Sequence, residues 1–280
     1  MDNRVTLTAH RGYREKYPEN TMVSFREALK LDIDSIEMDV HMTKDYEIVV
    51  CHDMNLSRTT DKSGNICHMT LAEVREADAG IKFGEEFKGE KVPTLTEFLA
   101  LMATRPDLRI LLELKDYPEE IGDFAYASAE KTLSLCREYG IFGKDRLTII
   151  TFSSGICAWL RARYTREDFA IHGFYPKRVM RGYEKDDPYK YYDEVCLFAK
   201  EEKTPEGMMG EKPLSPVVDK ARFTEFALMG IKPCVYFRFN TNEEDYRAAF
   251  ENGALGFTCD DPKTCGEMLD RIGARKLKNN

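Results

Sequence analysis

Two acidic residues stand two positions apart inside an apolar run of the sequence. Glu37 and Asp39 alternate with apolar residues over positions 35–40. In a β-strand, residues i and i+2 project to the same face, so the two carboxylates are expected side by side. Neighbouring carboxylates raise each other's pKa unless a cation lies between them. The spacing therefore indicates a metal site.

Two other apolar runs in the first part of the chain end in polar pairs. His10 and Arg11 follow the first run, and His52 and Asp53 follow the second. An imidazole group titrates near neutral pH and can accept or donate a proton. Histidines, acids and an arginine are thus expected at the ends of three early strands.

The composition excludes several classes of function. The chain has 280 residues and a net charge of −8, with its acids spread along its length, whereas a nucleic-acid-binding protein needs a basic patch. No apolar stretch approaches the length that spans a bilayer, and residues 1–4 are polar, so we expect neither stable membrane insertion nor a signal peptide. A small-molecule partner remains, and the acidity does not exclude one that carries a phosphate.

The cysteines indicate the redox compartment. The sequence has eight of them, scattered and without a C-x-x-C pair. This usage is typical of free, buried thiols in a reducing compartment rather than of a zinc site or a disulfide framework. We therefore expect a cytoplasmic protein.

Short apolar runs alternate with helical patterns from end to end, which indicates parallel strands joined by crossover helices. Strands are expected at 5–9, 35–40, 47–51, 108–114, 147–152, 169–174, 233–239 and 254–259, with a further one near 195–199. This count and the chain length are typical of a (β/α)₈ TIM barrel, here one domain over residues 1–280. A doubly wound open sheet is the alternative, but its glycine-rich phosphate loop is absent.

Residues 53–92 interrupt the alternation. They are polar and rich in Gly, Asp, Lys and Glu, so we expect a small inserted cap after the second or third strand. Residues 181–216 combine charges with tyrosines, and the sequence assigns them no role. In a TIM barrel the active site lies at the carboxyl ends of the strands. The polar residues at or near the ends of the predicted strands are His10, Arg11, Glu37, Asp39, His52, Glu113, Lys115 and Asp260.

A series of motifs in a set order carries a family resemblance. The motifs are His-Arg-Gly (10–12), Pro-Glu-Asn-Thr (18–21), Ile-Glu-Met-Asp-Val (36–40), Val-Val-Cys-His-Asp (49–53), Leu-Ser-Arg-Thr-Thr (56–60), Pro-Thr-Leu-x-Glu-Phe (93–98) and Glu-Leu-Lys (113–115). With them, the chain resembles the glycerophosphodiester phosphodiesterase family. The resemblance implies a TIM barrel that hydrolyses glycerophosphodiesters to glycerol 3-phosphate and an alcohol.

The resemblance also implies roles for individual residues. It implies one divalent cation, Mg²⁺ or Ca²⁺, with hard oxygen ligands. Carried over position by position, the metal ligands are Glu37, Asp39 and Glu113, the acid/base pair is His10 and His52, and the phosphate contacts are Arg11 and Lys115. Where similar proteins often have a late tryptophan, this chain has Phe237, which we expect to form an aromatic wall of the substrate site.

Two alternatives remain at this stage. A phosphodiesterase acting on lysophospholipid or sphingolipid headgroups would use the same fold, and a non-catalytic barrel could bind a glycerophosphate-type ligand. Where similar proteins often have an aspartate, this chain has Ser153, so the substrate's alcohol moiety stays open. The native metal, the oligomeric state, the identity of the nucleophile and the division of acid and base roles between the histidines stay open too.

Several polar residues outside this set are expected to be structural. We expect His41 to lie in a turn, Asn20 to cap the following helix, Arg58 to close a turn, and Asp260 to cap the last helix. His68 and His172 are expected in structural or surface positions.

Overall fold

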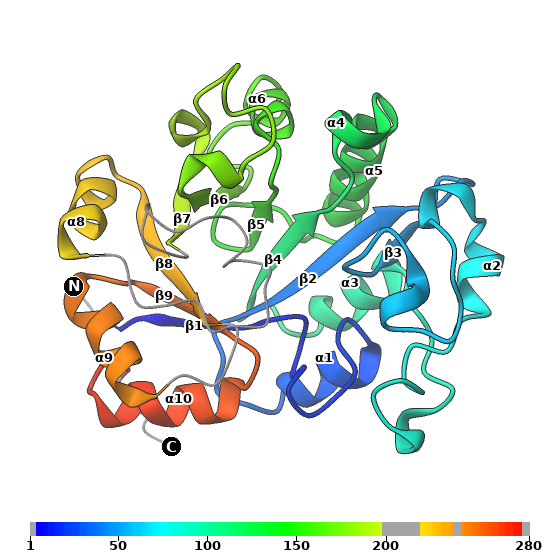
Figure 1. Ribbon diagram of the computed structural model, residues 1–280, viewed down its shortest axis with the longest axis horizontal. Helices are drawn as coiled ribbons and strands as arrows, with labels where there is room; N and C mark the ends of the chain where they lie inside the picture. The colour runs from blue at the N-terminus through cyan, green and yellow to red at the C-terminus, as the bar shows by residue number, and fades with distance from the viewer. Residues whose placement is uncertain (1–3, 198–218, 238–241, 276–280) are drawn as a thin grey trace.

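Eight parallel strands close into a barrel (Figure 1). The computed structural model describes residues 4–197, 219–237 and 242–275. The barrel strands are β1 (Thr6–Ala9), β2 (Ser35–Met42), β4 (Arg109–Leu114), β5 (Leu147–Ile150), β6 (Ala170–Tyr175), β7 (Glu194–Leu197), β8 (Lys232–Phe237) and β9 (Gly256–Cys259). Strand β1 pairs with both β2 and β9, which closes the ring. The predicted (β/α)₈ barrel is confirmed, and the doubly wound open sheet is wrong because that sheet would leave two edges.

Helices cover the outside of the barrel (Figure 1). They are α1 (Met22–Ala28), α3 (Leu95–Ala103), α5 (Phe124–Glu138), α6 (Ser154–Arg161), α8 (Lys220–Leu228), α9 (Glu243–Asn252) and α10 (Pro262–Arg271), with the short α2 (Leu71–Arg75) and α4 (Pro118–Ile121). Within the described ranges, none of the helices is both long and apolar enough to cross a membrane.

The alternation of side chains along β2 shows how the strands separate core from site. Ile36, Met38 and Val40 are fully buried members of the main hydrophobic cluster. The intervening Glu37 and Asp39 project to the opposite face of the same strand. Most of the driving force for folding lies on the first face, at roughly 1.5–3 kcal/mol per buried side chain, so the second face is free to carry polar groups.

The third early run does not form a barrel strand. Strand β3 (Ile48–Val50) pairs antiparallel with the end of β2, with Val50 opposite Val40. The connection at 43–47 is a turn, and a parallel pairing would need a crossover of a dozen or more residues. His52 therefore reaches the barrel mouth on the return strand of a hairpin.

The segment that follows β3 contributes no strand to the barrel. It contains α2 and three short 3₁₀ turns, η1 (Leu56–Arg58), η2 (Ile66–His68) and η3 (Glu85–Phe87). Its apolar residues pack in a small cluster of their own, which includes Leu56, Ile66 and Val74. The position of this excursion agrees with the insertion expected after the second or third strand.

Some element boundaries differ from the expectations. The helix α1 is capped by Thr21, whose side chain accepts a hydrogen bond from the Ser24 amide, so the prediction for Asn20 is wrong by one position. Residues 198–218 and 238–241 lie outside the residues that the structure describes. The last residues of the strand expected near 195–199 and of the strand expected at 233–239 fall in these two ranges.

A close approach on the outer face of β6 gives a stability prediction. A Cβ atom on Gly173 of β6 would lie 1.8 Å from the ring of Tyr192, whose side chain is fully buried. Gly173→Ala should therefore destabilise the protein by about 1–3 kcal/mol through overpacking, measured by urea denaturation. Gly266→Ala is the matched control. Its Cβ would meet only an ordinary contact at 3.4 Å, and alanine favours the helix, so this variant should be as stable as the wild type or more so.

Candidate functional site

Three buried carboxylates meet at the carboxyl ends of β2 and β4. Asp39 lies opposite Glu113 in the strand register, and Glu37 precedes Asp39 by two residues. One ligand atom from each of the three acids lies within 4.8 Å of the others. Glu37 Oε1 and Asp39 Oδ1 are buried without a hydrogen-bond partner. Because buried oxygens are rarely left unpartnered, the three acids fit a divalent cation with hard oxygen ligands.

The electrostatics of the cluster are uneven. Burial, followed by the neighbouring charge of Asp39, raises the pKa of Glu37 well above its ordinary value. Burial would also raise the pKa of Asp39, but the charges of Arg11, His52 and Lys115 and the hydrogen bond from Asn20 together outweigh it and hold that pKa well below the usual range. Without a further cation, the cluster therefore holds one carboxyl group whose ionisation is disfavoured.

Arg11 contacts the cluster from a strained loop. Its backbone N–H donates to Glu37 Oε2 at 2.9 Å, and its Nε lies 3.2 Å from Asp39 Oδ2. Arg11 and Gly12 both have left-handed backbones, with φ of 54° and 82°. A Cβ at Gly12 would lie 2.8 Å from the backbone of Ser24, so the motif needs glycine there. This loop directs the arginine inwards, onto the acids.

Asn20 is the residue that sequence reasoning placed at a helix end. It has a left-handed φ of 57°, and its Nδ2 donates to Asp39 Oδ2 at 2.8 Å. Asparagine tolerates this conformation better than most residues, and the hydrogen bond orients one of the acids. The sequence feature that could have indicated a role for Asn20 in the site is its place in the Pro-Glu-Asn-Thr motif, next to Glu19.

Lys115 brings a second cation to the same place. Its Nζ donates to Glu113 Oε1 at 2.8 Å and to His52 Nε2 at 3.0 Å, and it lies 3.8 Å from Asp39 Oδ1. Burial would lower the pKa of this lysine, but the charge of Glu113, together with Tyr117 and Asp39, outweighs it and raises the pKa. Lys115 therefore stays charged and joins the carboxylates to one of the histidines.

Each of the two histidines is held by an aspartate through Nδ1. His52 Nδ1 lies 2.5 Å from Asp53 Oδ1, and His10 Nδ1 lies 2.7 Å from Asp260 Oδ1. An Nδ1–H bond to a carboxylate leaves Nε2 as the reactive nitrogen. His10 Nε2 lies 3.8 Å from Glu37 Oε2, so both histidines turn this nitrogen towards the cluster or its lysine.

Burial shifts both imidazoles in one direction. Desolvation, followed by the charge of Arg11, lowers the pKa of His10 to about 4, although Asp260 opposes the shift. Burial also lowers the pKa of His52, and Asp39 opposes it. In this state both rings are neutral at pH 7 and can accept a proton.

The expectation that Asp260 caps the last helix is wrong. Asp261 is the N-cap of α10, and its carboxylate accepts a hydrogen bond from the Thr264 amide at 3.1 Å. Asp260 instead turns into the barrel mouth towards His10. Two adjacent aspartates precede Pro262. Asp261, directly before the helix, is the N-cap, so Asp260 is free to contact His10.

The expectation that Phe237 lines the substrate site is also wrong. Its ring packs against Tyr246 of α9, with centroids 4.8 Å apart, on the helix side of β8. The preceding residue, Tyr236, faces the site. Its ring lies 4.5 Å from the ring of His10, and its hydroxyl donates to Asp260 at 3.4 Å. Neighbouring strand residues project to opposite faces, so only one of the two aromatic side chains can face the site.

The expectation that His41 lies in a turn is wrong as well, because this residue lies within β2. Pairing with β3 extends β2 to Met42, so His41 shares the face of Glu37 and Asp39 and is buried. Its Nδ1 lies 2.6 Å from Asp116 Oδ1, and its Nε2 lies 3.2 Å from the carbonyl oxygen of His52. His41 and Asp116 thus support the backbone that carries His52.

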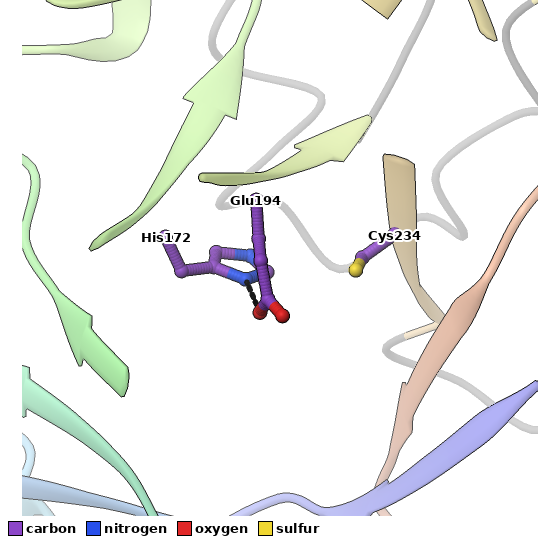
Figure 2. Close-up of side chains that lie close together, drawn as sticks. All are labelled: His172, Glu194 and Cys234. Carbon is purple, nitrogen blue, oxygen red and sulfur yellow. Dashed lines mark hydrogen bonds and ion pairs between the residues drawn. The ribbon is translucent and has the colours of Figure 1, made fainter. Parts of the chain in front are cut away.

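A second group of possible ligands lies deeper in the barrel. Figure 2 shows His172, Glu194 and Cys234, which come from three neighbouring strands. Glu194 is already neutralised, because Arg109 donates to it at 2.6 Å and Lys232 Nζ lies 3.6 Å away. These two positive charges would repel a metal cation bound here, so Glu37, Asp39 and Glu113 form the better metal site. His172 is structural, as expected.

Comparison with known proteins agrees with this geometry. The sequence model of the glycerophosphoryl diester phosphodiesterase family matches residues 10–263. The chain belongs to this family. Among members with curated names, it is 39% identical over 148 residues to a glycerophosphodiester phosphodiesterase of Caldanaerobacter subterraneus subsp. tengcongensis, and 43% identical over 152 residues to one of Bacillus altitudinis. These matches cover 52% and 54% of this chain and 58% and 60% of the relatives, so the chain spans less than two thirds of their length.

Solved structures of the family share the fold. A phosphodiesterase of Oleispira antarctica, in complex with the product sn-glycerol-3-phosphate, superposes with a TM-score of 0.74 at 23% identity and covers 95% of this chain and 96% of its own. A glycerophosphodiester phosphodiesterase of Agrobacterium tumefaciens gives 0.66 at 22% identity, with 92% and 97% covered.

The aspartate partner of His10 can be tested in this family member by a neighbouring pair of substitutions. Asp260→Asn removes a charge that raises the pKa of His10, so the His10 imidazole should titrate at lower pH in an NMR titration. The ring also loses its fixed orientation, and kcat/KM should fall by about 100-fold. Asp261→Asn is the control, because asparagine is also a good N-cap and this side chain does not contact the histidine. An equal effect of both substitutions would contradict the assignment of Asp260.

Proposed function

We propose that this protein hydrolyses glycerophosphodiesters to glycerol 3-phosphate and an alcohol, in a metal-dependent reaction with His10 and His52 as the general acid and base. One observation carries the proposal. His10 and His52, each held by an aspartate through Nδ1, lie beside three buried carboxylates and two cations at one barrel mouth. This set of groups is suited to a phosphodiester, which is an anion, carries two ester oxygens and needs proton transfer at both the attacking and the leaving oxygen.

Glu37, Asp39 and Glu113 are the proposed ligands of one divalent cation, Mg²⁺ or Ca²⁺. The support is their mutual distance and the two buried oxygens without hydrogen-bond partners. A cation bound there would supply Lewis-acid stabilisation of charge on a phosphate oxygen.

Arg11 and Lys115 are the proposed phosphate contacts. Arg11 is buried and Lys115 is partly buried, and both lie next to the carboxylates, with Arg11 Nε 3.2 Å from Asp39 Oδ2 and Lys115 Nζ 2.8 Å from Glu113 Oε1. Their positive charges would offset the negative charge of the phosphodiester and the charge that grows on it during attack. They also orient the phosphorus towards the two imidazoles.

His10 and His52 are proposed to divide the proton transfers. One neutral imidazole accepts the proton of the attacking hydroxyl group through Nε2. The other imidazole takes up a proton from solvent before the reaction and, as the imidazolium ion, donates it to the departing alkoxide. Asp53 and Asp260 hold the rings and favour the imidazolium form in each case. Tyr236, which lies against His10, takes the place that sequence reasoning assigned to Phe237 as the proposed aromatic wall.

The rest of the proposal concerns the setting of the reaction. We propose that residues 1–280 form one catalytic domain, with 53–92 as a small cap beside the mouth. All eight cysteines are free and seven are buried, which supports a reducing, cytoplasmic location. The substrate is a small molecule, and neither nucleic acid nor stable membrane insertion is part of the proposal.

The substrate class is tested with a panel of glycerophosphodiesters and lysophospholipids, with Mg²⁺ or Ca²⁺ added. We expect release of glycerol 3-phosphate from water-soluble glycerophosphodiesters. His52→Ala should lower kcat/KM by about a hundred- to ten-thousandfold, since general acid–base catalysis contributes that much. His68→Ala, at an exposed position of the cap, is the control and should leave the rate unchanged. Turnover of lysophospholipids alone would favour the alternative substrate class, and binding without turnover would favour a non-catalytic barrel.

The metal site is tested by thermal unfolding, which does not depend on activity. Mg²⁺ or Ca²⁺ at about 100 times its Kd should stabilise the wild type by about 2.7 kcal/mol, and EDTA should reverse this. Glu37→Gln should abolish the stabilisation. In EDTA at neutral pH this variant should unfold at a higher temperature than the wild type, because an acid with a raised pKa destabilises the fold above its unfolded pKa. Glu130→Gln, exposed on α5, should behave like the wild type. A cation effect that persists in Glu37→Gln would exclude this site.

A further inference from the structure

Arg58 extends from the cap segment to two carboxylates at the barrel mouth. Its NH2 donates to Glu19 Oε1 at 2.7 Å and its NH1 to Glu19 Oε2 at 3.1 Å, while its Nε donates to Asp53 Oδ2. A guanidinium group presents its donors in one rigid plane, so it sets the distance and angle between the two acids. A lysine cannot make all three bonds.

The first of these acids holds His52. Asp53 uses one oxygen for Arg58 and the other for His52 Nδ1, at 2.5 Å. Burial would raise the pKa of Asp53, but the hydrogen bonds from His52 and Arg58 outweigh it and hold the pKa low. Arg58 therefore fixes the carboxylate that fixes the imidazole.

The second acid holds the phosphate-facing arginine. Glu19 Oε1 accepts a hydrogen bond from Arg11 NH1 at 2.8 Å, and Glu19 Oε2 lies 3.3 Å from Arg14 NH2. Arg14 Nε in turn lies 3.8 Å from Asp260, the partner of His10. Glu19 is thus surrounded by three guanidinium groups, and one of them comes from outside the barrel.

We propose that Arg58 is a positioning residue that couples the cap segment to the catalytic groups, holding His52 through Asp53 and Arg11 through Glu19. The proposal rests on the proposed function for its effect on rate, but its contacts do not. It also replaces the expectation that Arg58 merely closes a turn.

An ordinary surface ion pair is the alternative, since the Arg58 side chain is 44% exposed. The same segment contains such a pair. Arg75 donates to both oxygens of Glu97, at 2.6 and 3.1 Å, and both side chains are partly exposed. Glu97 otherwise caps the helix α3, whereas the partners of Arg58 continue to His52 and Arg11. Arg75 is therefore a matched control for loss of an arginine fork in the cap.

The first test is kinetic. With sn-glycero-3-phosphocholine and saturating Mg²⁺ or Ca²⁺, Arg58→Met should lower kcat by about 10- to 100-fold, because small displacements of catalytic groups have effects of this size. Guanidinium ion at millimolar concentration should restore part of the rate. Arg58→Lys should keep an intermediate rate and show no rescue. Arg75→Met should lose about as much thermal stability as Arg58→Met, but its kcat should stay unchanged.

The second test reads the geometry without turnover. In ¹H–¹⁵N spectra of the wild type, a hydrogen bond between His52 Nδ1–H and Asp53 should give a downfield proton resonance, assigned by its loss in His52→Ala. This resonance should broaden or move upfield in Arg58→Met and stay in place in Arg75→Met. If the wild type hydrolyses no glycerophosphodiester, the proposed function fails while this spectrum still decides the role of Arg58. Equal spectra and equal rates in Arg58→Met and Arg75→Met would overturn the proposal.

Discussion

The burial of three carboxylates in one place is the constraint on which the barrel mouth depends. Glu37, Asp39 and Glu113 approach within 4.8 Å, and in a low-dielectric site their mutual repulsion is large. Arg11 and Lys115 offset part of it, with contacts at 3.2 and 2.8 Å, and two oxygens are left without hydrogen bonds. The remaining negative charge is the reason why we propose a divalent cation here and, through that cation and the two basic residues, a phosphodiester substrate.

The fold satisfies this constraint by separating two tasks. The outward faces of the strands supply apolar burial and hence stability, so the inward faces can carry charge at the carboxyl ends. Deeper in the barrel, Glu194 is matched by Arg109 and Lys232 and forms a balanced structural cluster. At the mouth the balance is incomplete, and each histidine is held by its own aspartate. The cap segment adds Arg58, whose two carboxylate partners continue to a histidine and to an arginine of the site.

Much of the fold and of the acid cluster could be predicted from the sequence. The alternation of residues 35–40 was enough to place Glu37 and Asp39 on one face, because side-chain direction in a strand is a local property. Local pattern could not tell whether Tyr236 or Phe237 faces the barrel mouth, since both residues are aromatic. The register of β8 in the barrel decides that Tyr236 does. For the same reason, the sequence could not tell which of Asp260 and Asp261 caps the last helix and which contacts His10. His41 was misplaced because the hairpin with β3 lengthens β2 beyond the predicted strand.

The sequence by itself determined the order of strands and helices, the types of the chemically active residues and the family to which the motifs point. Only the tertiary structure decided which residues meet. His10 and Asp260 are 250 positions apart and come together because the last strand closes the barrel beside the first. Asp116 reaches His41, and Arg58 reaches Glu19, in the same way across distant segments. Hydrogen-bond partners at such separations follow from barrel closure and loop paths, whereas sequence patterns report only the local direction of each side chain.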